Sequence, residues 1–335
     1  MKHICLLIVA FLLVFCSPSE PQKQVLQGNA FGTTYTIQFF SSEAFNAERG
    51  MDSVIHAVNK SVSTYLPNSD ISKINRGDTT ILVDAIFKEI YRISETVHTN
   101  SQGYFDPTVG VLRNAYGFGD TAPIKIMDSV ALDSLMQFVG FGKVQISKEG
   151  KVVKEHSEIY FDFNAVAKGY GIDCIGKYLE KEGVENYIIE LGGEVLAKGK
   201  NLSKHKWWTA GVESVTSNLE NRSAVEVIQL KNQAMAGSGN YRKFRIDSLT
   251  GRKYVHTLNP LTGSAEQSDV TSATVIANSC GEADAYATAL MAMGLERSKE
   301  LLKTAIGIDA YLTYLDSLNI ERIYSTAGFK KLLKE

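Results

Sequence analysis

The pattern of hydrophobic and polar positions predicts strands and helices mixed along the chain. Residues 31–40, FGTTYTIQFF, alternate as a strand does and follow a glycine turn. Apolar residues then recur on one face of two predicted helices, over 44–62 and around 86–93. Residues 103–110, GYFDPTVG, break this periodicity with a glycine and a proline, and predict a loop.

The second half of the chain continues the mixture. Residues 165–182 predict a helix with Asp162 or Asn164 as its N-cap, although Gly169 and Gly171 lie inside it. A glycine inside a helix costs about 1 kcal/mol, which is tolerated more readily where a backbone or ligand must approach closely. The remaining pattern predicts strands on both sides of a Gly192-Gly193 turn, over 207–214, 224–230 and 272–278, and near 310–315 and 321–326, with helices over 282–293 and 295–306. Since strands and helices do not alternate strictly, we expect an α+β fold in one compact unit, and not a doubly wound parallel sheet.

Composition sets limits on the class of protein. The chain has 335 residues, and its 44% hydrophobic content is enough for a substantial core. A formal net charge of -2, without a basic run interleaved with aromatics, argues against a nucleic-acid partner.

The first sixteen residues, MKHICLLIVAFLLVFC, resemble an export signal. A lysine near the start precedes an apolar run over 4–15, which is short for a membrane-spanning helix but suits a signal peptide. The ending LVFC resembles a bacterial lipoprotein box with lipid on Cys16, although Phe15 stands where such boxes usually have a small residue. We therefore expect an exported lipoprotein, anchored in a membrane and facing the periplasm or cell exterior. An ordinary signal peptide or an uncleaved anchor is the alternative.

The polar, proline-containing segment after Cys16 predicts a flexible tether over 17–27, followed by one folded unit over 28–335. Cys174 and Cys280 are the cysteines of that unit, and they have no metal-ligand spacing. We expect buried free thiols, with a single disulfide as the alternative.

The stretch EADAYATALMAMG, residues 282–294, predicts an alanine-rich helix with two oxygen-bearing side chains one turn apart. Asp284 and Thr288 are four residues apart and therefore share a helical face. This pair is a candidate for binding a cation. Alternatively, the aspartate interacts with the helix N-terminus and the threonine hydroxyl bonds back to the helix backbone.

Several other segments carry polar residues that packing alone does not require. They are DPTVG (106–110), DFNAVAKG (162–169), ELGGE (190–194), AGSGNY (236–241) and HTLNP (256–260). The sequence contains no P-loop, no GxGxxG between a strand and a helix, no HExxH and no GxSxG.

Taken in order, from about residue 31 to residue 294, these motifs resemble the ApbE family of FAD:protein FMN transferases. The resemblance implies an ApbE-like, T-fold-related arrangement of mixed sheets with packed helices. It also implies an enzyme that uses Mg²⁺ to split FAD at its diphosphate. The FMN half is transferred onto a threonine of an acceptor flavoprotein and AMP is released. Many family members are exported lipoproteins, which agrees with the interpretation of Cys16.

The resemblance implies that Asp284, Thr288 and the backbone carbonyl of Ala165 bind Mg²⁺. Because Mg²⁺ prefers hard oxygen ligands and keeps phosphate or water in its remaining positions, three protein oxygens are a sufficient set. By the same resemblance, the residues that bind the flavin nucleotide are Phe31, Tyr65, Phe105, Asp106, Thr108, Asp162, Lys168, Ser238, His256 and Leu258.

Some positions depart from the family pattern or have a simpler interpretation. Phe31 stands where the family has methionine, Asn259 where it usually has an acid, and Gly237 where it usually has threonine. Taken alone, Lys168 reads equally well as a solvated side chain and Tyr65 as a half-buried core aromatic.

The acceptor threonine must lose a proton as its oxygen attacks phosphorus, and His256 is the candidate catalytic base because histidine titrates near neutral pH. Asp284 is the alternative base and the second candidate catalytic residue. Two further functions stay open at this stage. One is a Mg²⁺-dependent FAD pyrophosphatase that uses water as the nucleophile. The other is a flavin-binding lipoprotein without turnover.

Overall fold

The computed structural model describes residues 20–125, 127–213, 224–240, 244–246 and 251–334. The predicted signal peptide and Cys16 lie outside the described residues. Within the described ranges, no helix combines the length and apolar character needed to cross a membrane.

One antiparallel sheet, the main sheet, organises the described part of the chain. Its strands in spatial order are β1 (Gln22–Ala30), β2 (Thr33–Ser41), β5 (Asn186–Leu191), β6 (Glu194–Lys198), β10 (Gln233–Gly239), β13 (Val270–Ala277), β14 (Asp309–Leu315) and β15 (Glu321–Ser325). Neighbouring strands are antiparallel throughout, from the pairing of β1 with β2 to that of β14 with β15. The strands predicted from alternation are confirmed.

Strand β1 corrects one sequence-based boundary. It begins at Gln22 and pairs with β2 over nine residue pairs, so part of the predicted tether over 17–27 belongs to the fold. The segment looked like a linker because it is polar. An edge strand has one neighbour and can leave one face in water, so a polar sequence suits it as well.

Helices and short strands fill the connections of the main sheet. The helices are α1 (Ala47–Val62), α2 (Asp70–Asn75), α3 (Ala85–Asn100), α4 (Gly110–Tyr116), α5 (Ser129–Met136), α6 (Ala167–Lys181), α7 (Cys280–Met293), α8 (Leu295–Thr304) and α9 (Ala327–Lys330), with the 3-10 turn η1 (Phe141–Lys143). The short strands are β3 (Val144–Ile146) paired with β4 (Val152–Lys154), β11 (Phe244–Ile246) paired with β12 (Lys253–Val255), and a small sheet of β7 (Lys200–Asn201), β8 (Lys206–Glu213) and β9 (Ala224–Leu230).

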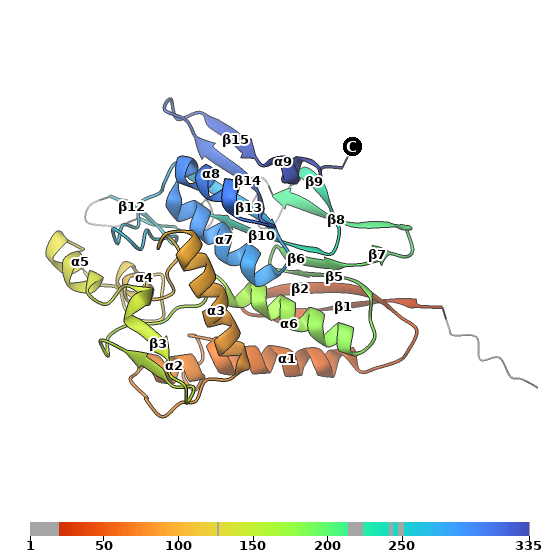
Figure 1. Ribbon diagram of the computed structural model, residues 1–335, viewed down its shortest axis with the longest axis horizontal. Helices are drawn as coiled ribbons and strands as arrows, with labels where there is room; N and C mark the ends of the chain where they lie inside the picture. Colours follow the sequence, from red (N-terminus) through yellow and green to blue (C-terminus); the bar gives the residue numbers. More distant parts are fainter. Residues whose placement is uncertain (1–19, 126, 214–223, 241–243, 247–250, 335) are drawn as a thin grey trace, which may run out of the picture.

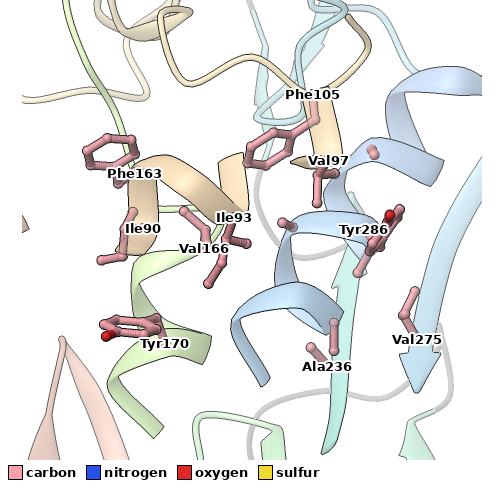
Figure 2. Close-up of a cluster of buried hydrophobic side chains, with 14 of the residues drawn as sticks. Ile90, Ile93, Val97, Phe105, Phe163, Val166, Tyr170, Ala236, Val275 and Tyr286 are labelled. Carbon is pink, nitrogen blue, oxygen red and sulfur yellow. The ribbon is translucent and has the colours of Figure 1, made fainter. Parts of the chain in front are cut away.

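The helices α1, α3, α6 and α7 pack next to one another along the main sheet (Figure 1). Apolar side chains from α3, α6 and α7 meet in a buried cluster that includes Ile90, Val97, Tyr170 and Tyr286 (Figure 2). Helix α7 touches both β10 and β13, and nearly all its residues are buried. Its alanines allow this close packing on several sides.

The small sheet and α9 form a second core with the main sheet. Trp208, Ile228 and Phe329 are buried there with Val195 and Met235 of the main sheet. Val195 and Met235 therefore face away from α7, whereas Ala236 belongs to the cluster that contains the α7 alanines. The α+β prediction is confirmed: helices and a small sheet bury different parts of one antiparallel sheet.

The start of α6 tests the predicted N-cap. Helix α6 begins after Val166, which makes no side-chain cap, so the expected capping by Asp162 or Asn164 is wrong. The Asp162 carboxylate instead accepts a hydrogen bond from the Asn164 backbone N–H at 2.8 Å, within the turn that precedes the helix.

Cys174 and Cys280 are free thiols, as expected, and Cys280 is fully buried.

Candidate active site

A cavity of about 540 Å³ opens where the loops before α4 and α6 meet β10 and α7. Its walls include every residue that the sequence suggested for the nucleotide or metal except Thr108: Phe31, Tyr65, Phe105, Asp106, Asp162, Ala165, Lys168, Ser238, His256, Leu258, Asp284 and Thr288. Cavities of this size are typical of small-molecule sites. Segments far apart in the chain therefore meet in one place.

Phe31 reaches the cavity from the tight turn between β1 and β2. Phe31 and Gly32 are the two turn residues, and both have positive φ, at 50° and 77°. Positive φ at both positions suits the twist of a two-residue hairpin, but it is strained for a bulky side chain. A Cβ on Gly171 would lie 2.6 Å from the Phe31 ring, so this helix glycine makes room for the aromatic ring.

The contact between α6 and α7 brings the predicted metal ligands to one wall. A Cβ on Gly169 would lie 2.3 Å from the carbonyl oxygen of Cys280, so only glycine allows this approach. The Gly169 N–H donates to Oδ2 of Asp284 at 3.1 Å. Ala165 lies in the turn just before α6 and lines the same cavity as Asp284 and Thr288.

Three buried charges lie together beside this contact. Lys168 Nζ pairs with Oε2 of Glu194 at 2.5 Å. Burial raises the pKa of Glu194 to about 7 and also raises that of Asp284, in each case against the attraction of Lys168. Burial lowers the pKa of Lys168, but Glu194 and Asp284 more than compensate and raise it. With two carboxylates around one ammonium group, the cluster favours an added cation.

The hydroxyl of Thr288 faces β10. Its Oγ1 lies 3.4 Å from Oγ of Ser238, and both side chains line the cavity. Asp284 and Thr288 therefore share a helical face toward the cavity, as their spacing predicts.

The described residues contain no group of three or more histidine, cysteine or acidic side chains that could hold a metal ion. That is compatible with the proposed ligands, because only Asp284 among them belongs to those residue types. A carboxylate, a hydroxyl and a main-chain carbonyl are all hard oxygen donors, which is the chemistry that Mg²⁺ prefers. The residues present therefore fit a Mg²⁺ ion.

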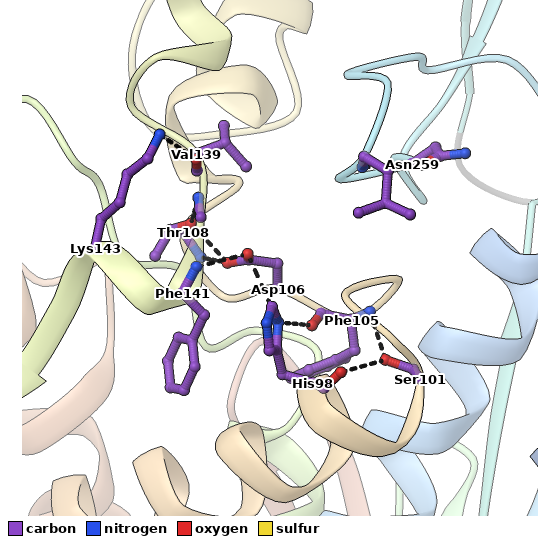
Figure 3. Close-up of polar contacts among 11 residues, drawn as sticks. His98, Ser101, Phe105, Asp106, Thr108, Val139, Phe141, Lys143 and Asn259 are labelled. Carbon is purple, nitrogen blue, oxygen red and sulfur yellow. Dashed lines mark hydrogen bonds and ion pairs between the residues drawn. The ribbon is translucent and has the colours of Figure 1, made fainter.

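The loop that carries Asp106 is braced from within. Its Oδ1 accepts hydrogen bonds from the N–H and hydroxyl of Thr108 at 2.8 and 2.6 Å, and its Oδ2 accepts one from the Phe141 N–H at 2.8 Å (Figure 3). The Thr108 hydroxyl also accepts from the Gly140 N–H at 2.7 Å. Thr108 is fully buried and does not line the cavity, in contrast to the sequence-based expectation. It supports Asp106 because a short hydroxyl side chain can bridge two loops.

Sequence reasoning missed Arg113, which reaches the cavity from α4. Its guanidinium forms a largely buried ion pair with the Asp162 carboxylate. Burial lowers the pKa of Arg113, and the nearby Tyr65 opposes that change. No spacing in the sequence links these residues. Glu194 was also missed as an individual residue, although its ELGGE segment had been singled out.

The turn between β12 and β13 presents His256 and Leu258 to the cavity. His256 is half-buried and Leu258 is buried. Asn259 holds this turn: its side-chain oxygen accepts from the Leu261 N–H at 3.0 Å, and its N–H donates to the Ser264 carbonyl at 2.8 Å. Asn259 therefore has a structural role in this turn.

Comparison with known proteins agrees with this arrangement. The model of the ApbE family matches residues 31–312. The chain belongs to the ApbE family. Relatives named FAD:protein FMN transferase include one from Vibrio cholerae, 33% identical, with 87% of this chain and 88% of the relative covered. Another, from Haemophilus influenzae, is 30% identical with 88% of each chain covered.

Solved structures of ApbE proteins share the fold. The flavin transferase ApbE from Vibrio cholerae superposes with a TM-score of 0.82 at 29% identity, covering 93% of this chain and all of the other. The apo flavinyl transferase ApbE from Pseudomonas stutzeri gives 0.81 at 25% identity, covering 93% of this chain and 97% of the other. The ApbE-like fold expected from the motifs is confirmed.

Proposed function

We propose that this chain is a Mg²⁺-dependent FAD:protein FMN transferase, which moves FMN from FAD onto a threonine of an acceptor flavoprotein and releases AMP. The observation that carries the proposal is one cavity lined both by aromatic residues and by the oxygen set of Asp284, Thr288 and Ala165. The names of the relatives support the same reaction.

The chain's own residues divide the work between binding and chemistry. Phe31 and Tyr65 offer aromatic faces to the flavin, and Asp162 is oriented by its ion pair with Arg113. Lys168 brings a positive charge toward the diphosphate and is held in place by Glu194. Bound Mg²⁺ would neutralise the diphosphate and stabilise the departing AMP.

His256 is the proposed base. It lines the cavity on a turn that Asn259 fixes. From there it takes the proton of the acceptor threonine as that oxygen attacks phosphorus. Replacing His256 with glutamine should lower kcat much more than it weakens FAD binding.

The test is to incubate the purified protein with FAD, Mg²⁺ and the exported and membrane proteins of cells that lack this gene. Transfer gives flavin fluorescence that stays with a protein band after denaturing electrophoresis, together with AMP. If only free FMN and AMP appear, the protein is a pyrophosphatase. If FAD stays intact for hours in Mg²⁺, it is a flavin-binding protein, and the proposal fails.

We also propose that the chain is exported and anchored in a membrane through lipid on Cys16, facing the periplasm or cell exterior. The apolar run over 4–15 and the LVFC ending support this. Replacing Cys16 with serine should move the protein from the membrane fraction to the soluble exported fraction. If the wild-type N-terminus carries no acyl group by mass spectrometry, the lipid anchor is wrong.

A further inference from the structure

Strand β10 is longer than the strand that pairs with one of its edges. β6 pairs with β10 only from Gln233 to Met235, because the chain of β6 begins at Glu194, just after the Gly192-Gly193 turn. β13 pairs with β10 as far as Gly239. Among the described residues, no strand pairs with Gly237–Gly239 on the β6 side. We call this stretch the open edge.

The direction of the backbone groups along the open edge follows from one hydrogen bond. The Asn240 N–H donates to the Thr271 carbonyl in the strand register shared with β13. Since backbone groups alternate in direction along a strand, Ser238 also points its N–H and C=O toward β13. Gly237 and Gly239 therefore point theirs toward the open side.

At Gly237, nothing in the described structure covers the open edge. Gly237 is exposed, and a Cβ built on it would meet no atom within 4 Å. All three residues of the edge line the cavity. The two residues that present donors and acceptors have no side chains, so another backbone can approach them closely.

We propose that the open edge binds the threonine-bearing segment of the acceptor protein as an added antiparallel strand that continues the row of β6. Added strands of this kind gain affinity from main-chain hydrogen bonds. This inference rests on the proposed transferase function and extends it to how the acceptor is recognised.

The register of such a strand brings a threonine to the reacting centre. A residue opposite Ser238 would form a pair without mutual hydrogen bonds, in which the two Cα atoms lie about 4.5 Å apart and the side chains are close. The side chain of Ser238 is 3.4 Å from Thr288, on the face of the sheet toward α7. A threonine opposite Ser238 therefore places its hydroxyl beside Asp284 and Thr288. Continuing the β6–β10 register places Glu194 opposite Ala236. The threonine opposite Ser238 would therefore lie two positions beyond Glu194 in the row of β6.

The first experiment uses peptides. Once a labelled acceptor protein is found, a synthetic nine-residue peptide centred on its FMN-carrying threonine serves as the substrate. N-methylation of the residue before or after the threonine removes an N–H that would face Gly237 or Gly239, and should lower kcat/KM at least about tenfold. N-methylation of the threonine itself removes an N–H that faces away from β10, and should change kcat/KM less than about threefold. Equal losses at all three positions would overturn the proposal.

The second experiment changes the protein. Gly237→Pro removes the N–H that points to the open side and leaves the hydrogen bonds to β13 intact. Gly237→Ala keeps that N–H and adds a methyl group into open space. The proline variant should lose at least about tenfold in kcat/KM for the peptide, relative to the alanine variant, with the same FAD dissociation constant and the same melting temperature.

The outcomes separate the two proposals. If the wild type releases only free FMN and labels no protein, the transferase function fails and the docking inference fails with it. If transfer occurs but Gly237→Pro transfers as fast as Gly237→Ala, the docking inference alone is wrong. If Gly237→Pro weakens FAD binding instead, the open edge serves the nucleotide and not the acceptor.

Discussion

Two buried aspartates join α6 and α7 in opposite directions. Asp173 of α6 accepts hydrogen bonds from the N–H groups of Cys280 and Gly281, both at 2.8 Å. Asp284 of α7 accepts one from Gly169 of α6 at 3.1 Å. Each borders a cavity, of about 480 Å³ for Asp173 and 540 Å³ for Asp284. Burial raises the pKa of both carboxyls, to about 6 for Asp173.

The difference lies in how the carboxylate oxygens are used. Both oxygens of Asp173 receive a backbone N–H at the start of α7, so this side chain works as a clamp between helices. Asp284 receives a backbone N–H on Oδ2 and shares its helix face with Thr288, beside Lys168. Burial and the nearness of a cavity do not distinguish a structural aspartate from a metal ligand. The hydrogen-bond partners of each carboxylate oxygen do.

The largest effect should come from Asp284→Ala. Removing the charged oxygen ligand should lower kcat at least about a thousandfold, or about 4 kcal/mol in the barrier, because electrostatic stabilisation of the diphosphate is lost. Rates of AMP release over a Mg²⁺ titration measure this. Activity that survives with ordinary Mg²⁺ dependence would mean that the metal assignment is wrong. Thr288→Ser, which keeps the hydroxyl, is the matched variant that should remain active.

Asp173→Ala should show the opposite behaviour. It leaves two buried N–H groups at the start of α7 without their acceptor, at a cost of about 2–5 kcal/mol in the free energy of unfolding. Denaturant unfolding measures this loss. In the fraction that remains folded, kcat should stay within about threefold of the wild type. A kcat loss as large as that of Asp284→Ala would erase the distinction between the two aspartates.

Glu194 should make the stability of the protein depend on pH. Because burial raises its pKa from 4.5 to about 7, the folded state holds the proton more tightly than the unfolded state does. The resulting stabilisation is complete below about pH 4.5 and is lost as pH rises through about 7, by up to about 3 kcal/mol. Melting temperatures in EDTA should therefore fall from pH 5.5 to 8. Glu194→Gln, which mimics the protonated acid, should melt higher than the wild type at pH 8, and the difference should shrink as pH falls toward 4.5.

The smallest effect should come from Gly171→Ala, in the part of α6 that faces Phe31. The added methyl overlaps the Phe31 ring, which can move only by disturbing its strained turn. FAD affinity should weaken by about three- to tenfold, measured by flavin fluorescence titration. Adding Phe31→Met, a slimmer and more flexible side chain, should recover most of the loss. If the double variant binds as weakly as the single one, the two residues are not coupled.

Much of the fold was predictable because its strands and helices carry clear periodicity. The hairpin around Gly192 and the helix at 282–293 are examples. Strand β1 was missed because polar edge strands and linkers have similar composition. The start of α6 was misjudged because Asp162 is engaged in the preceding turn and in the ion pair with Arg113, which no local pattern reveals.

The candidate site was predictable where its chemistry is local. Asp284 and Thr288 are four residues apart on one helix, so their shared face follows from helix geometry. Arg113 and Glu194 were missed because each acts through a partner on a distant segment, Asp162 and Lys168 respectively. The structural role of Thr108 depends on Gly140 in another loop, which is equally invisible in the sequence.

The enclosure of α7 has a consequence for motion. A helix buried on nearly all its faces cannot open without breaking both the main sheet and the neighbouring helices, so its amide hydrogens should exchange only when the whole molecule unfolds. The oxygens on α7 are then stationary on the timescale of turnover. Any movement that admits FAD or releases product must come from the loops that line the rest of the cavity.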